Sequence, residues 1–438
     1  MSTIDQAQFT TTALARAETL AGAATDAPDG VLTALRAAGR EALAAADLPG
    51  RKTESWKYSR VGALLEEGLL DRPRDDVAPV AVADLAGAPA ARLLFVDGAL
   101  RTVDALPDGV TVQRFSALEG PLASLVAERL GSLAPATARP FVALGASLLD
   151  DGVVVHVAAD CRVEAPLELV FAQGDDEVPC GGHARVLVVV EAGARATLVE
   201  RQLGTRLRFT NTVIEAFVEA NARLDHLRLA LDAGDGRWLS ALDVAVADGG
   251  RYGLHQALVG AAFRRSEIRL WTRGPGAHIE VGGATLTRDR THLDTQMSIE
   301  HAAPHGTSNQ TFRSIAGERS RTVLNGRIHI HPDAQKTAAQ FSTRNLLLSA
   351  NAEIDAKPEL EIYADDVTCA HGATVGRLDD GALFYLRARG IDEATARTML
   401  AFAFLAAVVA DFPLTEVGAQ VRAQLEAAFS APALEAAA

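Results

Sequence analysis

A small-residue turn that returns at an almost constant spacing most constrains what this chain can fold into. It occurs six times, as Gly193-Ala194, Asn221-Ala222, Gly249-Gly250, Gly276-Ala277, Gly306-Thr307 and Asp333-Ala334. The first members of successive pairs are 28, 28, 27, 30 and 27 residues apart, and short apolar stretches lie between them. A period of this size with strands throughout indicates a solenoid, in which each coil buries its interior against its neighbours.

The composition of the coils selects among solenoids. Leucine-rich repeats would need a Leu/Asn ladder and tetratricopeptide repeats would need helices, and neither pattern is present. Parallel coils of short strands with Gly, Asn or Asp at the corners are typical of a parallel β-helix. The chain is therefore predicted to be mainly β, with this β-helix at its centre.

Helical periodicity appears on both sides of the strand-rich region. We expect three regions: residues 1–90, helical with a linker; residues 91–376, the β-helix core; and residues 377–438, helical again. In the last region Asp392 is placed to cap a helix. After Met399 this helix is apolar nearly all round and includes Phe402 and Leu405, so it must be buried within this chain or against a partner.

Charge and cysteine content limit the classes of function. The formal net charge of −14 over 438 residues argues against nucleic-acid binding, which needs clustered Lys and Arg. The N-terminus lacks the basic start of a secretory signal, and no run reaches the roughly 18 apolar residues that span a bilayer. The chain has three cysteines, Cys161, Cys180 and Cys369. This number is small and odd, which argues against a disulfide framework. A cytoplasmic protein is expected.

Common catalytic fingerprints are missing from the sequence. It has no Gly-x-x-x-x-Gly-Lys-[Ser/Thr] loop, no Gly-x-Gly-x-x-Gly after a strand, no Cys-x-x-Cys and no His-Glu-x-x-His. These absences count against an ordinary stand-alone enzyme.

Two histidine-containing segments offer metal-ligand types at short spacing. His329 and His331 would share one face of a strand, either as imidazole ligands or, as we favour, as part of an exposed polar face between Ile328 and Ile330. Glu300, His301 and His305 form a second group. Pro304 interrupts any helical pair in it, so we expect a coil corner there rather than a zinc site.

Cys369 and His371 carry the chemistry that we single out. On a strand they would project to the same face, which places a thiol beside an imidazole. The alternative is a small buried Cys and a hydrogen-bonded His at the end of the solenoid. Asp365, Asp366 and Glu361 are near enough in sequence to orient the imidazole. Two ligands are too few for a closed metal site, so any cluster would need ligands from a second chain.

Three segments resemble the C-terminal signature of the SufB/SufD family, the scaffold subunits of the SUF iron–sulfur cluster assembly machine. They are residues 340–349, residues 357–376 with Cys369-Ala-His-Gly-Ala-Thr374, and residues 383–391. Residues 54–58 are similar to an N-terminal element of the SufD branch. Few cysteines and His371-Gly-Ala-Thr374, where the B branch reads His-Glu-Ala-Thr, favour the D branch.

The resemblance implies a right-handed parallel β-helix that pairs with a SufB-type sister and a SufC-type ABC ATPase. It implies that His371 matches the histidine at the sister interface, where a nascent cluster forms, and that Cys369 matches the neighbouring cysteine. The helix from Asp392 to Ala410 and its successor would dock the ATPase. The resemblance also implies that the chain is not an enzyme, and that its cluster is transient and shared with the partner. A reduced flavin on the complex, and a homodimer when the chain is alone, stay open.

Two rival functions are retained from the residues alone. A carbohydrate-active β-helix enzyme would use paired carboxylates, for which Asp365 and Asp366 could be offered. A purely structural adaptor would hold the ATPase without contributing cluster ligands. Substitution of His371 or Cys369 would separate the adaptor from the scaffold.

Overall fold

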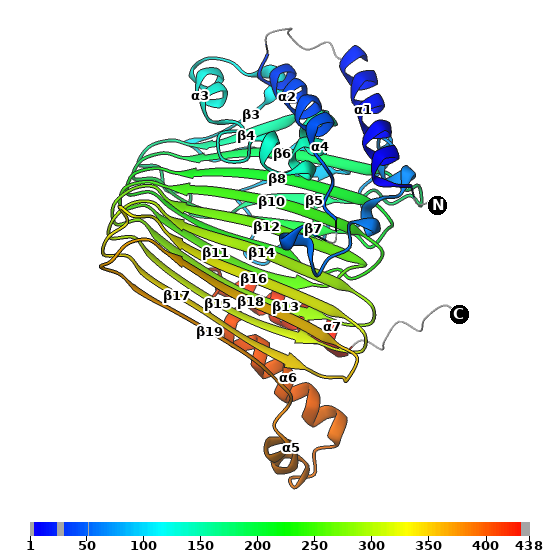
Figure 1. Ribbon diagram of the computed structural model, residues 1–438, viewed down its shortest axis with the longest axis vertical. Coiled ribbons are helices and arrows are strands. Elements are labelled where there is room, and N and C mark those ends of the chain that lie inside the picture. The colour runs from blue at the N-terminus through cyan, green and yellow to red at the C-terminus, as the bar shows by residue number, and fades with distance from the viewer. Residues whose placement is uncertain (1–3, 24–29, 51, 431–438) are drawn as a thin grey trace.

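The chain folds into a β-solenoid of about eight turns with helices at both ends (Figure 1). The computed structural model describes residues 4–23, 30–50 and 52–430. The prediction of a mainly β solenoid between helical regions is confirmed.

Two sheets form the walls of the solenoid, and from β4 onward consecutive strands alternate between them. The ten-stranded sheet contains β1 (Ala91–Val96), β2 (Ala99–Val103), β5 (Leu167–Ala172), β7 (Arg195–Leu203), β9 (Arg223–Ala230), β11 (Arg251–Val259), β13 (His278–Thr287), β15 (Thr307–Ala316), β17 (Ala338–Leu347) and β19 (Thr368–Gly376). The nine-stranded sheet contains β3 (Val110–Arg114), β4 (Gly152–Val157), β6 (Gly181–Val190), β8 (Phe209–Val218), β10 (Arg237–Val246), β12 (Phe263–Thr272), β14 (His292–His301), β16 (Arg321–Ile330) and β18 (Glu353–Ile362). Each coil contributes one strand to each wall.

The repeated turns are one corner of the solenoid, where the chain passes from the nine-stranded to the ten-stranded sheet. Gly193, Asn221 and Gly249 lie there with φ of +72°, +56° and +62°, and Gly276 follows with +69°. In the next two coils Gly306 and Asp333 also lie at this corner, as predicted, and the residues with a left-handed backbone are His305 and Lys336. A non-glycine residue can occupy this conformation, so composition alone misses it.

The interior is filled by ladders of apolar side chains. One ladder runs through five successive strands of the nine-stranded sheet and consists of Val186, Ile214, Leu242, Ile268 and Met297, which pair in register. All five are at most 3% exposed. Burying each such side chain stabilises the fold by roughly 1.5–3 kcal/mol. A coil gains this stabilisation only when neighbouring coils are present, so the coils fold together.

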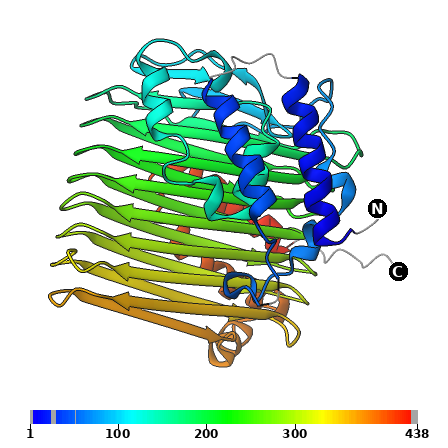
Figure 2. The same ribbon diagram turned by 45° about the horizontal axis from the view of Figure 1, so that its top comes forward.

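The N-terminal part of the chain covers the outer face of the nine-stranded sheet. It contains α1 (Gln6–Ala23), α2 (Val31–Ala45), η1 (Glu54–Trp56), η2 (Val61–Leu64) and η3 (Glu67–Leu70), and is joined by η4 (Phe115–Ala117), α3 (Pro121–Arg129), η5 (Ala136–Ala138) and α4 (Pro140–Ser147). Trp56 and Phe141 pack against Phe209, Leu239 and Phe263 of β8, β10 and β12. Figure 2 shows α1 and α2 lying over the coils nearest the N-terminal end.

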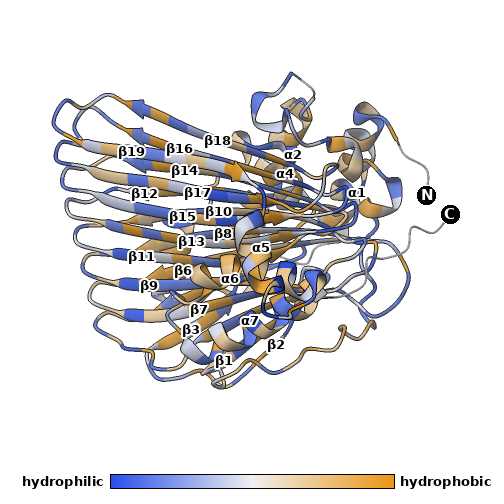
Figure 3. Ribbon diagram, turned by 90° about the horizontal axis from the view of Figure 1, so that it is seen from below, coloured by the Kyte–Doolittle hydropathy of each residue, from blue (hydrophilic) through white to orange (hydrophobic). Residues whose placement is uncertain are grey.

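Three helices follow the solenoid: α5 (Asp380–Arg387), α6 (Glu393–Val409) and α7 (Thr415–Ser430). Of these, α6 and α7 cover the outer face of the ten-stranded sheet. Leu405 of α6 and Val421 of α7 share an apolar cluster with Leu286 and Ile315 of β13 and β15. Figure 3 shows α6 and α7 along this sheet, with α5 next to them. The apolar face of α6 is therefore buried within this chain.

Among the residues described, no helix combines the length and the apolar character that crossing a bilayer requires.

Candidate functional site

The C-terminal end of the solenoid is open. Among the described residues, β18 pairs with β16 alone and β19 with β17 alone, so each is the last strand of its sheet. Most side chains of β19 are exposed and those of β18 are half-buried, whereas every residue of β6 is buried. The final coil has an interior that no further coil covers.

Cys369 and His371 lie on the interior side of this last coil. In the parallel register they face Ala339 and Phe341 of β17, which are 4% and 2% exposed and belong to the solenoid core. Cys369 is half-buried against that core and His371 is exposed. The two residues share a face, as their spacing predicts. Their role in cluster assembly stays a prediction.

The thiol of Cys369 is not activated by its own chain. Burial raises its pKa above the ordinary value, so a cation or metal would have to come from elsewhere to favour the thiolate. No hydrogen bond or ion pair to His371 is found within the described part of the chain. Asp366 instead pairs with Lys336, and Glu361 lies 3.3 Å from Arg327. The expectation that Asp366 or Glu361 orients the imidazole is therefore not supported.

Asp365 and Asp366 lie in the corner between β18 and β19 rather than on a strand. Both side chains are exposed. They do not form the pair of carboxylates, facing one another across a groove, on which the carbohydrate-enzyme alternative depends.

The four residues predicted for partner docking divide into buried and exposed positions. The Asp392 carboxylate caps α6 by accepting a hydrogen bond from the Thr395 backbone N–H at 2.9 Å. Leu405 is 1% exposed and packs on the solenoid. It was predicted to contact a partner, but in the structure it is buried within this chain. Phe402 is half-buried in the same cluster, and Met399 is 47% exposed.

Two exposed aromatic residues of α5 were not singled out from the sequence. Phe384 and Tyr385 of α5 are 73% and 56% exposed. The run Leu383-Phe-Tyr-Leu386 is the sequence feature from which their exposure could have been predicted. A helix of eight residues cannot bury four consecutive large apolar side chains on one face.

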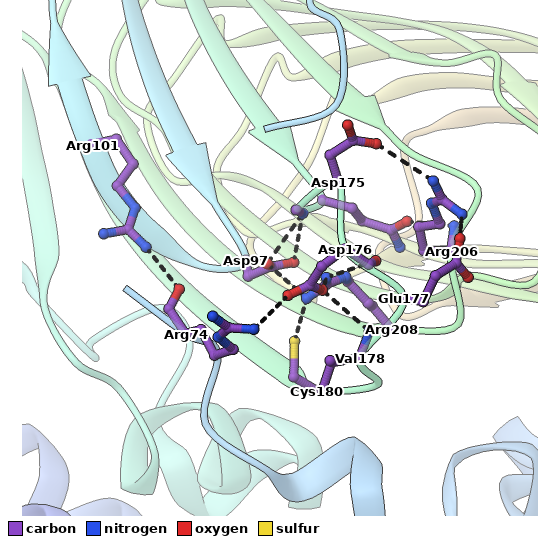
Figure 4. A network of polar contacts seen from close by, with 12 residues as sticks. Arg74, Asp97, Arg101, Asp175, Asp176, Glu177, Val178, Cys180, Arg206 and Arg208 are labelled. Atoms are coloured by element: carbon purple, nitrogen blue, oxygen red, sulfur yellow. Dashed lines mark hydrogen bonds and ion pairs between the residues drawn. The ribbon is translucent and has the colours of Figure 1, made fainter. Parts of the chain in front are cut away.

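Cys180 contrasts with Cys369. It lies in a buried polar network around Arg208, whose guanidinium donates to Asp97 at 2.8 Å, to the Cys180 sulfur at 2.7 Å and to the Asp176 carbonyl at 3.1 Å (Figure 4). Burial raises the pKa of the Cys180 thiol to about 12. Cys180 is therefore an unreactive structural residue, and Cys369 is the cysteine at the open end.

The two histidine-containing segments meet in the structure, although only one residue of the first segment, Glu300, takes part in the contact. Glu300 of β14 lies beside His329 and His331 on the outer face of the nine-stranded sheet. His301 instead points into the fold, where burial lowers its pKa to about 4 and its Nε2 lies 2.9 Å from Ser308. His305 occupies the predicted corner. Glu300 and His329 are separated in the sequence by one coil, and this spacing is the feature from which their contact could have been predicted.

Two protein-family models match this chain. The profile described as "SUF system FeS cluster assembly, SufBD core domain" matches residues 171–404, and the profile described as "SufBD protein N-terminal region" matches residues 94–169. The chain belongs to the SufBD family. The core match spans the open coil, with Cys369 and His371, and most of α6.

Full-length relatives are similar over most of their length. The chain is 33% identical over 365 residues to the iron–sulfur cluster assembly protein SufD of Escherichia coli, covering 82% of this chain and 84% of the relative. It is 30% identical over 410 residues to a SufBD family protein of Synechocystis sp., covering 90% of each. Protein ABCI7, chloroplastic, of Arabidopsis thaliana is 28% identical over 405 residues, 89% of this chain and 85% of the relative. Membership of the SufBD family supports a role in SUF iron–sulfur cluster assembly.

Proposed function

We propose that this SufBD chain is a non-catalytic scaffold subunit of the SUF complex. It would pair with a SufB-type sister through its open coil and bind a SufC-type ATPase through its C-terminal helices. The observation that carries the proposal is the uncovered end, with free edges on β18 and β19 and with Cys369 and His371 over the core. Free strand edges are ready to pair with another chain, so a second solenoid would complete this one.

The nascent cluster would be cargo that passes through the shared site. One thiol and one imidazole leave positions to fill, and a thiolate from the sister would complete a soft ligand set. Pairing would also remove His371 and Cys369 from bulk water. We propose His371 as the principal ligand from this chain and Cys369 as its neighbour.

The ATPase would act by moving the two solenoids relative to each other. Its dimerisation on binding ATP would shift the paired coils and expose or assemble the site between them. The exposed side chains of Phe384, Tyr385 and Met399 give the C-terminal helices an apolar surface that suits such a contact. We place the complex in the cytoplasm, which fits three cysteines that are all free.

The first test is co-expression of the untagged chain with SufB-type and SufC-type proteins from one genome, followed by native mass spectrometry. A defined heterocomplex that contains the ATPase is the expected result. Recovery of the chain only as a monomer or homodimer, with both partners well expressed, would overturn the proposal.

The second test separates the scaffold from a structural adaptor. His371→Ala should leave the complex intact and abolish cluster assembly, because the substitution removes a ligand and no packing. Thr374→Ala, an exposed change on the same strand, serves as the matched control and should retain assembly. If His371→Ala supports full assembly with all partners present, the chain is an adaptor.

A further inference from the structure

A second group of metal-ligand side chains lies on the outer face of the nine-stranded sheet, near its open end. Glu300 of β14 pairs in register with His329 of β16, and His331 follows the last residue of β16. Ile328 and Ile330 are fully buried, so His329 and His331 project to the outside together.

Both imidazoles meet the same oxygen of one carboxylate. Nδ1 of His329 lies 2.6 Å, and Nε2 of His331 3.2 Å, from Oε2 of Glu300. The two rings are stacked, with centroids 4.2 Å apart. Three donor atoms, one from each residue, lie within 4.8 Å of one another.

The carboxylate is held in place by its other oxygen. Oε1 of Glu300 accepts hydrogen bonds from the Ser298 hydroxyl at 2.5 Å and from the Arg327 guanidinium at 2.6 Å. Glu300 is therefore an oriented oxygen donor, held by hydrogen bonds of the kind that residues beyond the ligands provide in metal sites.

Arg327 is shared between two carboxylates, because Glu361 lies 3.3 Å from its guanidinium on the other side. The site also opens outward in steps, because the side chains of Glu300, His329 and His331 are 5%, 19% and 33% exposed. An ion placed between the three would keep positions for water on the His331 side.

We propose that Glu300, His329 and His331 bind a divalent first-row transition-metal ion of the Fe²⁺ or Zn²⁺ class. Two neutral imidazoles and one carboxylate are the ligands that such ions take with open positions left over, whereas Mg²⁺ and Ca²⁺ prefer oxygen alone. The site lies on the opposite sheet from Cys369 and His371 and faces outward. It does not depend on the proposed cluster role of the open coil.

The test is anaerobic titration of the untagged full-length chain with Co²⁺, followed by visible absorption and calorimetry. The unaltered chain should bind one Co²⁺ tightly, and His331→Ala should weaken that binding by at least about tenfold, since it removes a ligand. His329→Ala should have a similar effect. Zn²⁺ and Fe²⁺ should displace the Co²⁺, and excess Mg²⁺ should not.

Two matched variants control the experiment. His156→Ala removes a half-buried imidazole that lies 3.2 Å from a single carboxylate, Glu191, and should leave Co²⁺ binding unchanged. His371→Ala removes the histidine at the open coil and should also leave it unchanged. Circular dichroism of each variant checks the fold, which partly exposed histidines should not disturb.

Three results would overturn the proposal. They are the absence of a stoichiometric Co²⁺ site in the unaltered chain, binding that survives both His329→Ala and His331→Ala in folded protein, and binding that is lost with His371→Ala instead.

Discussion

The two ends of the solenoid are built differently. At the N-terminal end β1 and β2 form an antiparallel hairpin, β3 pairs antiparallel with β4, and α2 and α3 pack against β4. At the C-terminal end β18 and β19 stop without a further strand, although three helices follow them. Those helices leave the end uncovered, and α6 and α7 lie along the ten-stranded sheet.

This difference shows which end of the solenoid is covered by described parts of its own chain and which is not. A solenoid needs a cap because each coil is stabilised only by its neighbours, and an uncapped end exposes strand edges that pair with other chains. The open end carries Cys369, His371 and the exposed Ile362, Tyr363 and Val375. The open end is thus the part of the molecule suited to a partner.

The largest expected effect tests the closed end. Phe95 is 1% exposed and its ring lies 4.9 Å from that of Phe171, so Phe95→Ala should lower the free energy of unfolding by about 3–5 kcal/mol. His371→Ala at the open end should change it by less than about 0.5 kcal/mol. Urea denaturation of the two variants measures the difference. Similar losses in both would show that the ends are not distinct.

The buried carboxylate of Glu215 tests how the closed end is joined to the coils. It accepts hydrogen bonds from the backbone N–H groups of Gly131, Leu133 and Ala134 at 2.9–3.0 Å and pairs with Arg185. Glu215→Gln leaves the buried Arg185 without its counter-charge and should lower the free energy of unfolding by about 3 kcal/mol.

The same residue predicts a response to acid. Burial raises the pKa of Glu215, but Arg185 and the backbone donors outweigh it, so the folded-state pKa lies below its usual 4.5. A depressed pKa contributes stability that is present above the unfolded value and is lost as pH falls through the folded one. The unaltered chain should therefore lose more stability below about pH 4.5 than Glu215→Gln does. If the free energy of unfolding falls equally in the two chains as the pH is lowered, the ion pair with Arg185 is contradicted.

The rates at which Cys369 and Cys180 react with a thiol reagent compare the open end with the buried part of the solenoid. Cys369 should react with a maleimide at least about tenfold faster than Cys180, because Cys180 is buried with a raised pKa. The measurement uses a Cys161→Ser background and peptide mass spectrometry. A SufB-type partner should slow the labelling of Cys369 and leave Cys180 unchanged, and faster labelling of Cys180 would invert the comparison.

The smallest expected effect on stability is at α5. Phe384 is 73% exposed, so Phe384→Ala should change the free energy of unfolding by less than about 0.5 kcal/mol. Its effect should appear only as weaker co-purification of the ATPase. Leu383→Ala, at the buried residue beside it, is the matched control and should destabilise the chain itself.

Most of the fold could be read from local sequence. The corner at Gly193, Asn221, Gly249 and Gly276 was predicted because glycine and asparagine favour a left-handed backbone. The helix after Asp392 was predicted from its cap and its apolar spacing. The next two corners were also predicted, at Gly306 and Asp333, but their left-handed residues are His305 and Lys336, which lack the local preference of glycine.

The candidate sites divide in the same way. The shared face of Cys369 and His371 follows from a spacing of two on a strand, so sequence was enough. The contact of Glu300 with His329 and His331 depends on how one coil lies on the next, and no local pattern in either segment specifies it. The burial of Leu405 likewise depends on which sheet face α6 covers.

The sequence by itself determined the period, the solenoid, the helical ends and the family, because these depend on residues close together in the chain or on a contiguous motif. The tertiary structure alone decided which end stays open, which helices cover which sheet, and which donors meet across coils. Those features depend on contacts between residues a coil or more apart, whose register is fixed only when the coils stack and bury their common interior.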